Sequence, residues 1–395
     1  MKYLNWVEIN KENLKHNVLQ FQKLLGDKRK LCCVVKSNAY GHGLIGVAQI
    51  IAELNQEIWL GVNFIDEALL IKNSDIKNAI IILGYTPLAR LKEAVEIGAR
   101  MVVYNLETIK KLAELTLRRV QGKKINVHIK LETGTGRQGV LVEDLLDFVI
   151  EIKKYPNIEI EGLSTHFANI EDTTNHNYAK KQLNAFNDAI NILEKNNINI
   201  PIKHTACTAA TILFPETYFN MARVGIGLYG LWPSKETFVS AMHNPSLYPP
   251  LNKGRVRVGE KIELKPVLTW KTRVAQLKKM AAGSYISYGC TEKLNKDSLV
   301  AVLPIGYYDG YDRKLSGVGD VLIKGQRAKV LGRICMNMFM VDVSDIEGVQ
   351  LEDEAVLLGK QGSEEITAEE MANKIGTINY EVVTRINPLL PREYI

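Results

Sequence analysis

The sequence predicts an α/β protein, a (β/α)₈ barrel of the TIM type followed by a mainly β C-terminal domain. From residue 5 to about 232, short β-branched runs alternate with amphipathic segments, which is the pattern of repeated βα units. There are eight such runs, and eight parallel strands close a barrel. From residue 262 onward, short strand-like runs are separated by Gly, Asp and Asn, which indicates a separate β-rich domain.

The first expected strand, residues 31–35, is apolar throughout, and such a strand is buried on both faces, as in a parallel sheet. The eight expected strands cover residues 31–35, 58–62, 79–83, 101–104, 125–131, 158–164, 202–205 and 222–228. The expected helices have apolar residues at helical spacing and cover residues 44–54, 66–72, 89–97, 107–117, 145–153 and 180–195. This order suits a barrel better than an open doubly wound sheet.

Residues 233–260 interrupt the pattern, because prolines accompany a basic run there. We interpret this stretch as a linker or an insertion, and we predict a barrel domain over residues 1–240 and a mainly β domain over residues 241–395. Within the second domain, strands are expected near 267–274, 299–303, 328–331 and 338–343, with one helix at 368–374.

The composition, 46% hydrophobic and 24% charged over 395 residues, is typical of a globular protein of about two domains. No stretch approaches the roughly 18 apolar residues of a membrane span, and the start lacks the apolar core of a signal peptide, so we expect a cytoplasmic protein. The five cysteines form no Cys-x-x-Cys pair, so we expect reduced thiols and no metal site. The net charge of +6 is spread in short clusters, which indicates solvated faces and neither a nucleic-acid nor a membrane surface.

Lys36 follows the first buried strand directly, where the carboxyl end of a parallel strand opens onto a cleft. Desolvation lowers the pKa of a lysine, and a neutral amine condenses with an aldehyde to form an imine. A lone lysine at such a position is more often a surface residue that closes the strand. The neighbouring residues Asn38, Tyr40 and Gly41-His42-Gly43 favour the chemical interpretation.

Residues 34–43, Val-Val-Lys-Ser-Asn-Ala-Tyr-Gly-His-Gly, resemble the cofactor-lysine motif of the alanine racemases, a family of pyridoxal-phosphate enzymes. The resemblance extends in family order from Trp6 to Arg392. It implies that Lys36 holds pyridoxal 5'-phosphate as an imine and that Tyr40 contacts the cofactor.

Residues 130–140, Lys-Leu-Glu-Thr-Gly-Thr-Gly-Arg-Gln-Gly-Val, resemble a second stretch of this family. The resemblance makes Lys130, which is often carbamylated in the family, the support for Arg137, and Arg137 the group that faces the substrate carboxylate. The same glycines formally match the Gly-x-Gly-x-x-Gly motif of dinucleotide-binding proteins. That interpretation requires the motif in the first βα turn with a helix starting there, whereas it follows the fifth expected strand.

Three further barrel segments carry the resemblance. Each residue has an ordinary structural interpretation when it is taken alone, such as a core histidine or a basic residue at a strand start. By resemblance, His166 packs beside the pyridine ring, and Arg223 faces the pyridine nitrogen and leaves it neutral, because a guanidinium has only donors. The phosphate is expected to bind Thr208, Gly225 and Ile226. The chain has Cys207-Thr208 where the family usually has Asn-Ser.

In the second domain, Ser287-Tyr288-Gly289 resembles the motif whose tyrosine is the second catalytic base. The resemblance also implies that Tyr307 lines the entrance, that Met336 offers a backbone group to the substrate carboxylate, and that Tyr380 contacts the phosphate and narrows the pocket. Asn337 stands where the family usually has aspartate.

The resemblance implies an amino-acid racemase that interconverts L- and D-alanine by a two-base mechanism and supplies D-alanine for cell-wall peptidoglycan. It also implies a homodimer with composite active sites, because the second tyrosine comes from the partner subunit in the family. The alternatives are a racemase of serine or of broad specificity and an amino-acid decarboxylase of the same fold. A non-catalytic cofactor carrier and an NAD-dependent oxidoreductase are further rivals.

Overall fold

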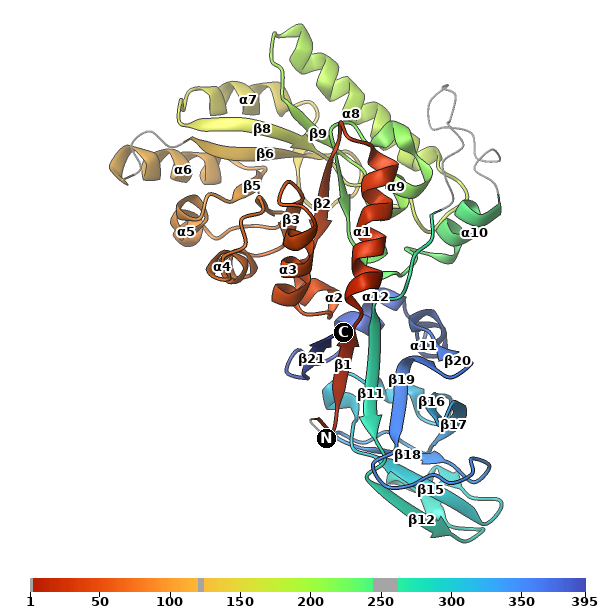
Figure 1. Cartoon of the computed structure of the whole chain (residues 1–395). Helices are drawn as coiled ribbons and strands as arrows, with labels where there is room; N and C mark the ends of the chain where they lie inside the picture. The colour runs from red at the N-terminus through yellow and green to blue at the C-terminus, as the bar shows by residue number, and fades with distance from the viewer. Residues whose placement is uncertain (1–2, 120–123, 244–261) are drawn as a thin grey trace. The chain divides into compact units, whose positions relative to one another are not determined.

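The computed structural model describes residues 3–119, 124–243 and 262–395 and divides the chain into two compact units (Figure 1). The barrel unit comprises Leu14–Ser37 and Leu44–Lys265, and the β unit comprises Met1–Asn13, Asn38–Gly43 and Pro266–Ile395. Of the predicted linker, residues 244–260 lie outside the described residues, whereas Lys235–His243 form α10. The predicted domain division at residue 240 stays a prediction.

Eight parallel strands of the barrel unit follow one another in the hydrogen-bonded order β10-β2-β3-β4-β5-β6-β8-β9. They are β2 (Lys30–Val34), β3 (Trp59–Val62), β4 (Ile80–Ile82), β5 (Arg100–Val103), β6 (Ile125–Glu132), β8 (Ile158–Ser164), β9 (Ile202–His204) and β10 (Met221–Val224). Between β9 and β10, the backbone N–H of Asn220 donates to the carbonyl of Lys203 at 3.0 Å, and that of Arg223 donates to the carbonyl of Ala206 at 2.9 Å. The predicted fold class and all eight predicted strands are confirmed.

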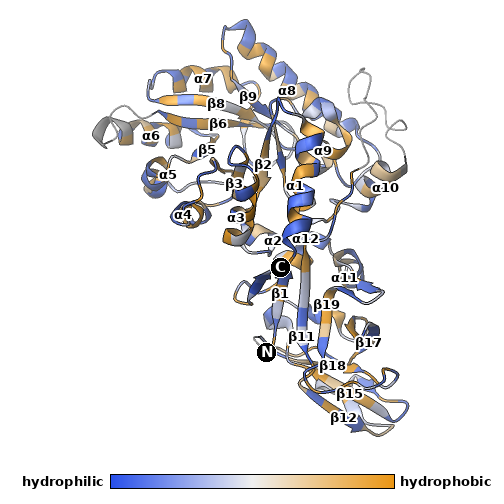
Figure 2. Ribbon diagram, viewed as in Figure 1, coloured by the Kyte–Doolittle hydropathy of each residue, from blue (hydrophilic) through white to orange (hydrophobic). Residues whose placement is uncertain are grey.

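The helices lie around the outside of these strands (Figure 1). The helices of the barrel unit are α1 (Lys11–Leu25), α3 (Leu44–Leu54), α4 (Ile65–Asn73), α5 (Leu91–Glu96), α6 (Leu106–Arg119), α7 (Leu145–Lys153), α8 (Asn177–Lys195), α9 (Thr208–Leu213) and α10. Figure 2 shows hydrophobic and hydrophilic residues alternating along α1, whose buried residues Leu14, Val18, Phe21 and Leu25 recur at helical spacing. The sequence analysis did not predict α1 or α10.

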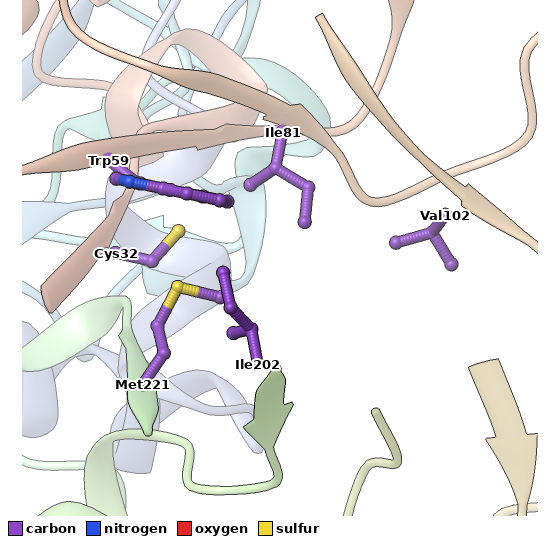
Figure 3. Close-up of a cluster of buried hydrophobic side chains, with 6 residues drawn as sticks. All are labelled: Cys32, Trp59, Ile81, Val102, Ile202 and Met221. Atoms are coloured by element: carbon purple, nitrogen blue, oxygen red, sulfur yellow. The ribbon is translucent and has the colours of Figure 1, made fainter. Parts of the chain in front are cut away.

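Apolar side chains from six strands fill part of the barrel interior (Figure 3). The cluster consists of Cys32, Trp59, Ile81, Val102, Ile202 and Met221. Trp59, Ile202 and Met221 are the first residues of β3, β9 and β10. The amino end of the barrel is therefore packed, which leaves the carboxyl ends of the strands for polar chemistry.

The β unit contains a ten-stranded sheet with the order β12-β15-β18-β17-β16-β19-β11-β1-β21, and β20 pairs with β19. The strands are β1 (Trp6–Ile9), β11 (Leu268–Arg273), β12 (Gln276–Met280), β15 (Ser298–Leu303), β16 (Asp320–Ile323), β17 (Gln326–Leu331), β18 (Phe339–Asp342), β19 (Glu354–Gln361), β20 (Glu364–Ile366) and β21 (Arg392–Tyr394). A short hairpin joins β13 (Tyr285–Ile286) and β14 (Glu292–Lys293), and α11 (Ala368–Ile375) and α12 (Asn379–Thr384) complete the unit. The sequence did not predict β1, which pairs with β11 and β21. In the part of the chain that the structure describes, no helix has the length and apolar character needed to cross a membrane.

Candidate active site

Lys36 lies just beyond the carboxyl end of β2 and begins the short element α2 (Lys36–Tyr40). The preceding residue is anchored to the sheet, since the N–H of Val35 donates to the carbonyl of Gly61 at 2.8 Å. Burial lowers the pKa of Lys36, and the positive charge of Arg137 lowers it further, whereas Glu67 acts in the opposite direction. The lysine is thus biased toward the neutral, nucleophilic amine.

The four residues after Lys36 form a left-handed turn, a feature that the sequence did not predict. Ser37, Asn38, Ala39 and Tyr40 have φ values of 57°, 56°, 52° and 52°. Each non-glycine residue in this region costs about 1–2 kcal/mol. The surrounding structure must therefore hold the turn, and one contact in the barrel unit is the N–H of Ser37, which donates to Glu67 Oε1 at 2.5 Å.

Within the β unit, the C-terminal strand β21 holds the segment that follows this turn. The guanidinium of Arg392 donates to the carbonyl of Gly41 at 3.2 and 3.0 Å, and the hydroxyl of Tyr394 donates to the carbonyl of His42 at 3.1 Å. The rings of Tyr40 and Tyr380 lie with their centroids 6.1 Å apart. The structure thus brings together two predicted cofactor contacts from opposite ends of the chain.

Arg223 lies at the centre of the barrel site, on β10, and is almost fully buried. Its NH1 group donates to His204 Nδ1 at 2.7 Å and to the carbonyl of His204 at 2.8 Å, and NH2 donates to the carbonyl of Thr165 at 2.8 Å. These bonds hold the guanidinium against the ends of β8 and β9. Its Nε–H takes part in none of them.

Four basic side chains act electrostatically on His166, which is in the loop directly after β8. Burial and then the charges of Arg223, Lys130, Arg137 and Lys36 hold the pKa of His166 well below its ordinary value of 6.5. The ring is therefore neutral, and the two arginines and two lysines that act on it make its environment positive. Basic side chains grouped in this way favour an anionic ligand, such as a phosphate or a carboxylate.

Lys130, on β6, has the more strongly lowered pKa of the two lysines in this group. Burial, followed by the charges of Arg223 and Arg137, lowers its pKa from 10.5 to about 7. A large fraction of this amine is neutral at pH 7, and a neutral amine can accept carbon dioxide to form a carbamate.

The glycine-rich loop after β6 is folded around its own acidic residue. The carboxylate of Glu132 accepts hydrogen bonds from the N–H groups of Gly134 (2.6 Å), Thr135 (2.6 Å) and Arg137 (3.0 Å). These amides are therefore occupied, and the loop leads into the short strand β7 (Val140–Leu141) instead of a helix. A dinucleotide-binding loop needs free backbone amides and a helix that begins at the loop, and this loop offers neither. The sequence analysis assigned no role to Glu132.

Thr208 and Gly225, two predicted phosphate contacts, meet in the structure. The N–H of Gly225 donates to Thr208 Oγ1 at 3.1 Å, which leaves the proton of the hydroxyl for another acceptor. Ile226 begins the 3₁₀ turn Ile226–Tyr229 beside them. A Cβ at Gly227 would lie 2.7 Å from Thr208 Cγ2, so only glycine leaves room beside this hydroxyl.

In the β unit, Tyr288 is 72% exposed and begins a 3₁₀ turn. The preceding residue, Ser287, has φ 66° and bonds through its hydroxyl to the carbonyl of Arg333 at 2.5 Å. The N–H of Tyr307 donates to the carbonyl of Cys335, which directly precedes the exposed Met336. The predicted residues Tyr307 and Met336 therefore lie on adjacent loops. The predicted active site contains residues of both units, and that part of the prediction stays a prediction.

Comparisons with known proteins give the same family for both parts of the chain. Residues 9–233 match the alanine racemase N-terminal domain, and residues 267–394 match the alanine racemase C-terminal domain. The alanine racemase of Leptospira interrogans serovar Copenhageni is 38% identical over 392 residues, with 99% of this chain and 95% of the relative covered. Alanine racemase 1 of Clostridium acetobutylicum is 40% identical over 391 residues, with the same shares covered.

Solved structures agree with the sequence relatives. The alanine racemase of Clostridium difficile 630 superposes with a TM-score of 0.88 at 33% identity, and 100% of this chain and 96% of that chain are covered. The alanine racemase of Bacillus anthracis, solved with bound L-Ala-P, gives a TM-score of 0.88 at 32% identity over the same shares.

Proposed function

Because the chain belongs to the alanine racemase family, we propose that Lys36 and Tyr288 exchange the α-proton of alanine and so interconvert its L and D forms. The enzyme is an isomerase that acts on alanine. The observation that carries the proposal within this chain is the set of four basic side chains that act on His166, namely Arg223, Lys130, Arg137 and Lys36, since Lys36 among them is an amine of lowered pKa.

The family uses pyridoxal 5'-phosphate, and the residues of the barrel unit fit this cofactor. Lys36 offers the amine for the imine, Thr208 retains a hydroxyl proton for the phosphate, and Arg223 offers only donors toward the ring. His166, Gly225 and Ile226 of the barrel unit, with Tyr40 and Tyr380 of the β unit, are the remaining proposed contacts. When bound, the cofactor withdraws electrons from the α-carbon and so acidifies its hydrogen.

The residues of this chain then move one proton on each face of the substrate. Nζ of Lys36 removes or delivers the proton on one side, and Oη of Tyr288 does so on the other, so the centre inverts. Arg137 binds the substrate carboxylate, assisted by a backbone group of Met336, and a carbamate on Lys130 would hold Arg137 in place. Tyr307 lines the entrance.

The proposed homodimer explains the exposure of Tyr288. Large side chains are exposed on the β unit, and they include Tyr288, Tyr307, Tyr308, Met336 and Met338. Exposed apolar and aromatic groups of this size favour a protein interface. We propose that Tyr288 completes the active site of the partner subunit. We also propose a cytoplasmic enzyme that supplies D-alanine for peptidoglycan.

A decarboxylase of the same fold is disfavoured, since it should lack both the Tyr288 motif and Arg223. The other alternative is a racemase of a different amino acid. It is raised by Cys207 and Asn337, the two positions at which this chain differs from the usual family residues. Desolvation raises the pKa of the Cys207 thiol to about 11, so this residue adds no charge at the proposed phosphate site. Asn337 is exposed.

A substrate panel at equal concentrations, followed by circular dichroism, tests the proposal. Alanine should racemise fastest and serine more slowly, because a small pocket excludes longer side chains by steric overlap. Faster turnover of lysine, arginine or ornithine would contradict alanine as the substrate. Lys36→Ala is the inactive control.

A further inference from the structure

A chain of hydrogen bonds, buried at Arg223 and at two histidines and part-buried at its other end, leads away from the residues that the proposed function uses. His204 Nε2 lies 2.8 Å from His128 Nδ1, and His128 Nε2 lies 3.1 Å from Glu161 Oε2. Arg100 closes the chain, since its Nε donates to Glu161 at 3.0 Å. The two imidazoles are fully buried. We call this set, Arg223, His204, His128, Glu161 and Arg100, the interior hydrogen-bond chain.

The two ends of this chain allow one arrangement of protons on the histidines. A guanidinium only donates, so His204 Nδ1, 2.7 Å from Arg223 NH1, must accept, and its proton lies on Nε2. That proton points at His128 Nδ1, so the proton of His128 also lies on Nε2, where the carboxylate of Glu161 accepts it. Arg223 at one end and Glu161 at the other therefore require the same arrangement, in which both imidazoles are neutral and carry their proton on Nε2. Burial lowers the pKa of both histidines, which agrees with neutral rings.

The backbone is irregular where it presents Glu161. In the pairing of β6 with β8, Val127 is opposite Ile160, but His128 is opposite Gly162, so Glu161 is the extra residue of a β-bulge. A bulge re-aims a side chain and is found beside active sites. A Cβ at Gly162 would lie 2.0 Å from His128 Nδ1, so only glycine leaves room for this imidazole.

The outer end of the chain is braced as well. The guanidinium of Arg100 lies over the ring of Trp59 at 4.5 Å, and Trp59 contacts His128 edge-on with ring centroids 5.7 Å apart. Trp59 belongs to the interior cluster of Figure 3. Trp59 therefore braces both Arg100 and His128, the residues that hydrogen-bond to Glu161, and the carboxylate of Glu161 can act as a fixed acceptor for His128.

We propose that Glu161 and His128 are positioning residues for Arg223. They fix the tautomer of His204, which keeps its Nδ1 a permanent acceptor and so holds the guanidinium in one orientation toward the cofactor ring. This inference rests on the proposed role of Arg223 in the active site. It adds two residues, remote from the substrate, to the machinery of the reaction.

The decisive measurement is the ¹⁵N spectrum of the histidine side chains in the cofactor-free protein at pH 7, where protonated and bare ring nitrogens of a neutral imidazole are resolved. His128 and His204, assigned from the signals lost in His128→Asn and His204→Asn, should both carry the proton on Nε2. A proton on Nδ1 of either ring, or an imidazolium, would overturn the inference. Because the wild-type spectrum requires neither cofactor nor turnover, it is independent of the proposed activity.

Glu161→Gln tests the consequence for catalysis, because an amide offers either a donor or an acceptor and no longer imposes one tautomer. In this variant only the Arg223 end still favours the Nε2–H tautomers, so the spectrum should show a second population with the proton of His128 on Nδ1, and kcat for alanine should fall by about tenfold or more with KM changed less than twofold. Glu159→Gln, on the exposed part of the same strand, is the matched control and should change neither. A kcat of Glu161→Gln equal to that of the control would contradict the positioning role, whereas an inactive wild type would contradict the proposed function instead.

Discussion

Two lysines of the barrel unit, Lys36 and Lys130, are candidates for the same chemistry at the scale of single residues. Both have lowered pKa values for the same first cause, burial, and each lies near Arg137. Lys130 also lies near Arg223, and its pKa is about 7. The amine with the more neutral character is thus not the one that the family resemblance assigns to the cofactor. The pKa values alone therefore do not decide which lysine forms the imine. The position of each amine relative to the cofactor aldehyde must decide it.

Borohydride reduction separates the two lysines directly. The purified protein should be yellow, and reduction should fix the cofactor to Lys36, since only an imine at that amine is reducible. Peptide mapping of the reduced protein locates the label. Lys130→Met should be labelled at Lys36 as the wild type is, and a label on Lys130, or on no lysine, would refute the assignment.

The lowered pKa of Lys130 also predicts a pH-dependent stability. Between about pH 7 and 10.5 the unfolded chain binds more protons at this residue than the folded chain does, so its contribution to the free energy of unfolding rises with pH. Lys130→Met should therefore be more stable than the wild type at pH 7, and this advantage should shrink as the pH approaches 10. Urea unfolding of cofactor-free protein in buffer without carbon dioxide measures it, and a difference that does not vary with pH would contradict the lowered pKa.

At the scale of elements, the turn after Lys36 shows how distant segments support a strained backbone. Its left-handed residues lie between β2 and a segment of the β unit that Arg392 and Tyr394 hold by hydrogen bonds to backbone carbonyls. Arg392, at the end of the family resemblance, thus has a local structural function, which is to hold the carbonyl of Gly41, and Tyr394 holds the carbonyl of His42 in the same way. The backbone at Gly41 also packs closely against the backbone of Val383, which helps to hold the segment after the turn.

Gly41→Ala should destabilise the protein far more than a glycine substitution that changes φ alone. Gly41 has φ +87°, and a Cβ there would lie 2.1 Å from the carbonyl oxygen of Val383, so backbone must move. Gly376 has φ +72° with no atom within 4 Å of a Cβ, so Gly376→Ala should cost only about 1 kcal/mol. Thermal unfolding of both variants gives the comparison. Equal losses would mean that the contact with Val383 adjusts freely.

The sequence predicted the elements whose signals are local and missed those that depend on distant partners. The eight barrel strands were predicted because each is a short run with β-branched residues that alternates with amphipathic segments. The strand β1 was not, because its partners β11 and β21 lie at the other end of the chain. The left-handed turn has no glycine among residues 37–40 to signal it. His128 and Glu161 lie on separate strands and share no local motif, so only the β-bulge brings them together.

At the scale of the whole molecule, the two proposed bases come from different units of the chain. Lys36 belongs to the barrel unit, and the exposed Tyr288 belongs to the β unit. The family resemblance implies that Tyr288 serves the partner subunit, so that a homodimer has two composite sites. Under this arrangement each active site requires one intact base from each chain.

Mixing two inactive variants tests the composite site. Lys36→Ala and Tyr288→Ala homodimers should each be inactive, because every site lacks one base. In a refolded heterodimer, the lysine of one chain meets the tyrosine of the other at one site, and the second site has neither base. Heterodimers isolated with two different affinity tags should therefore recover about half of the wild-type activity per dimer. Heterodimers without activity would mean that a single chain supplies both bases, since in that case each chain of the heterodimer lacks one of them.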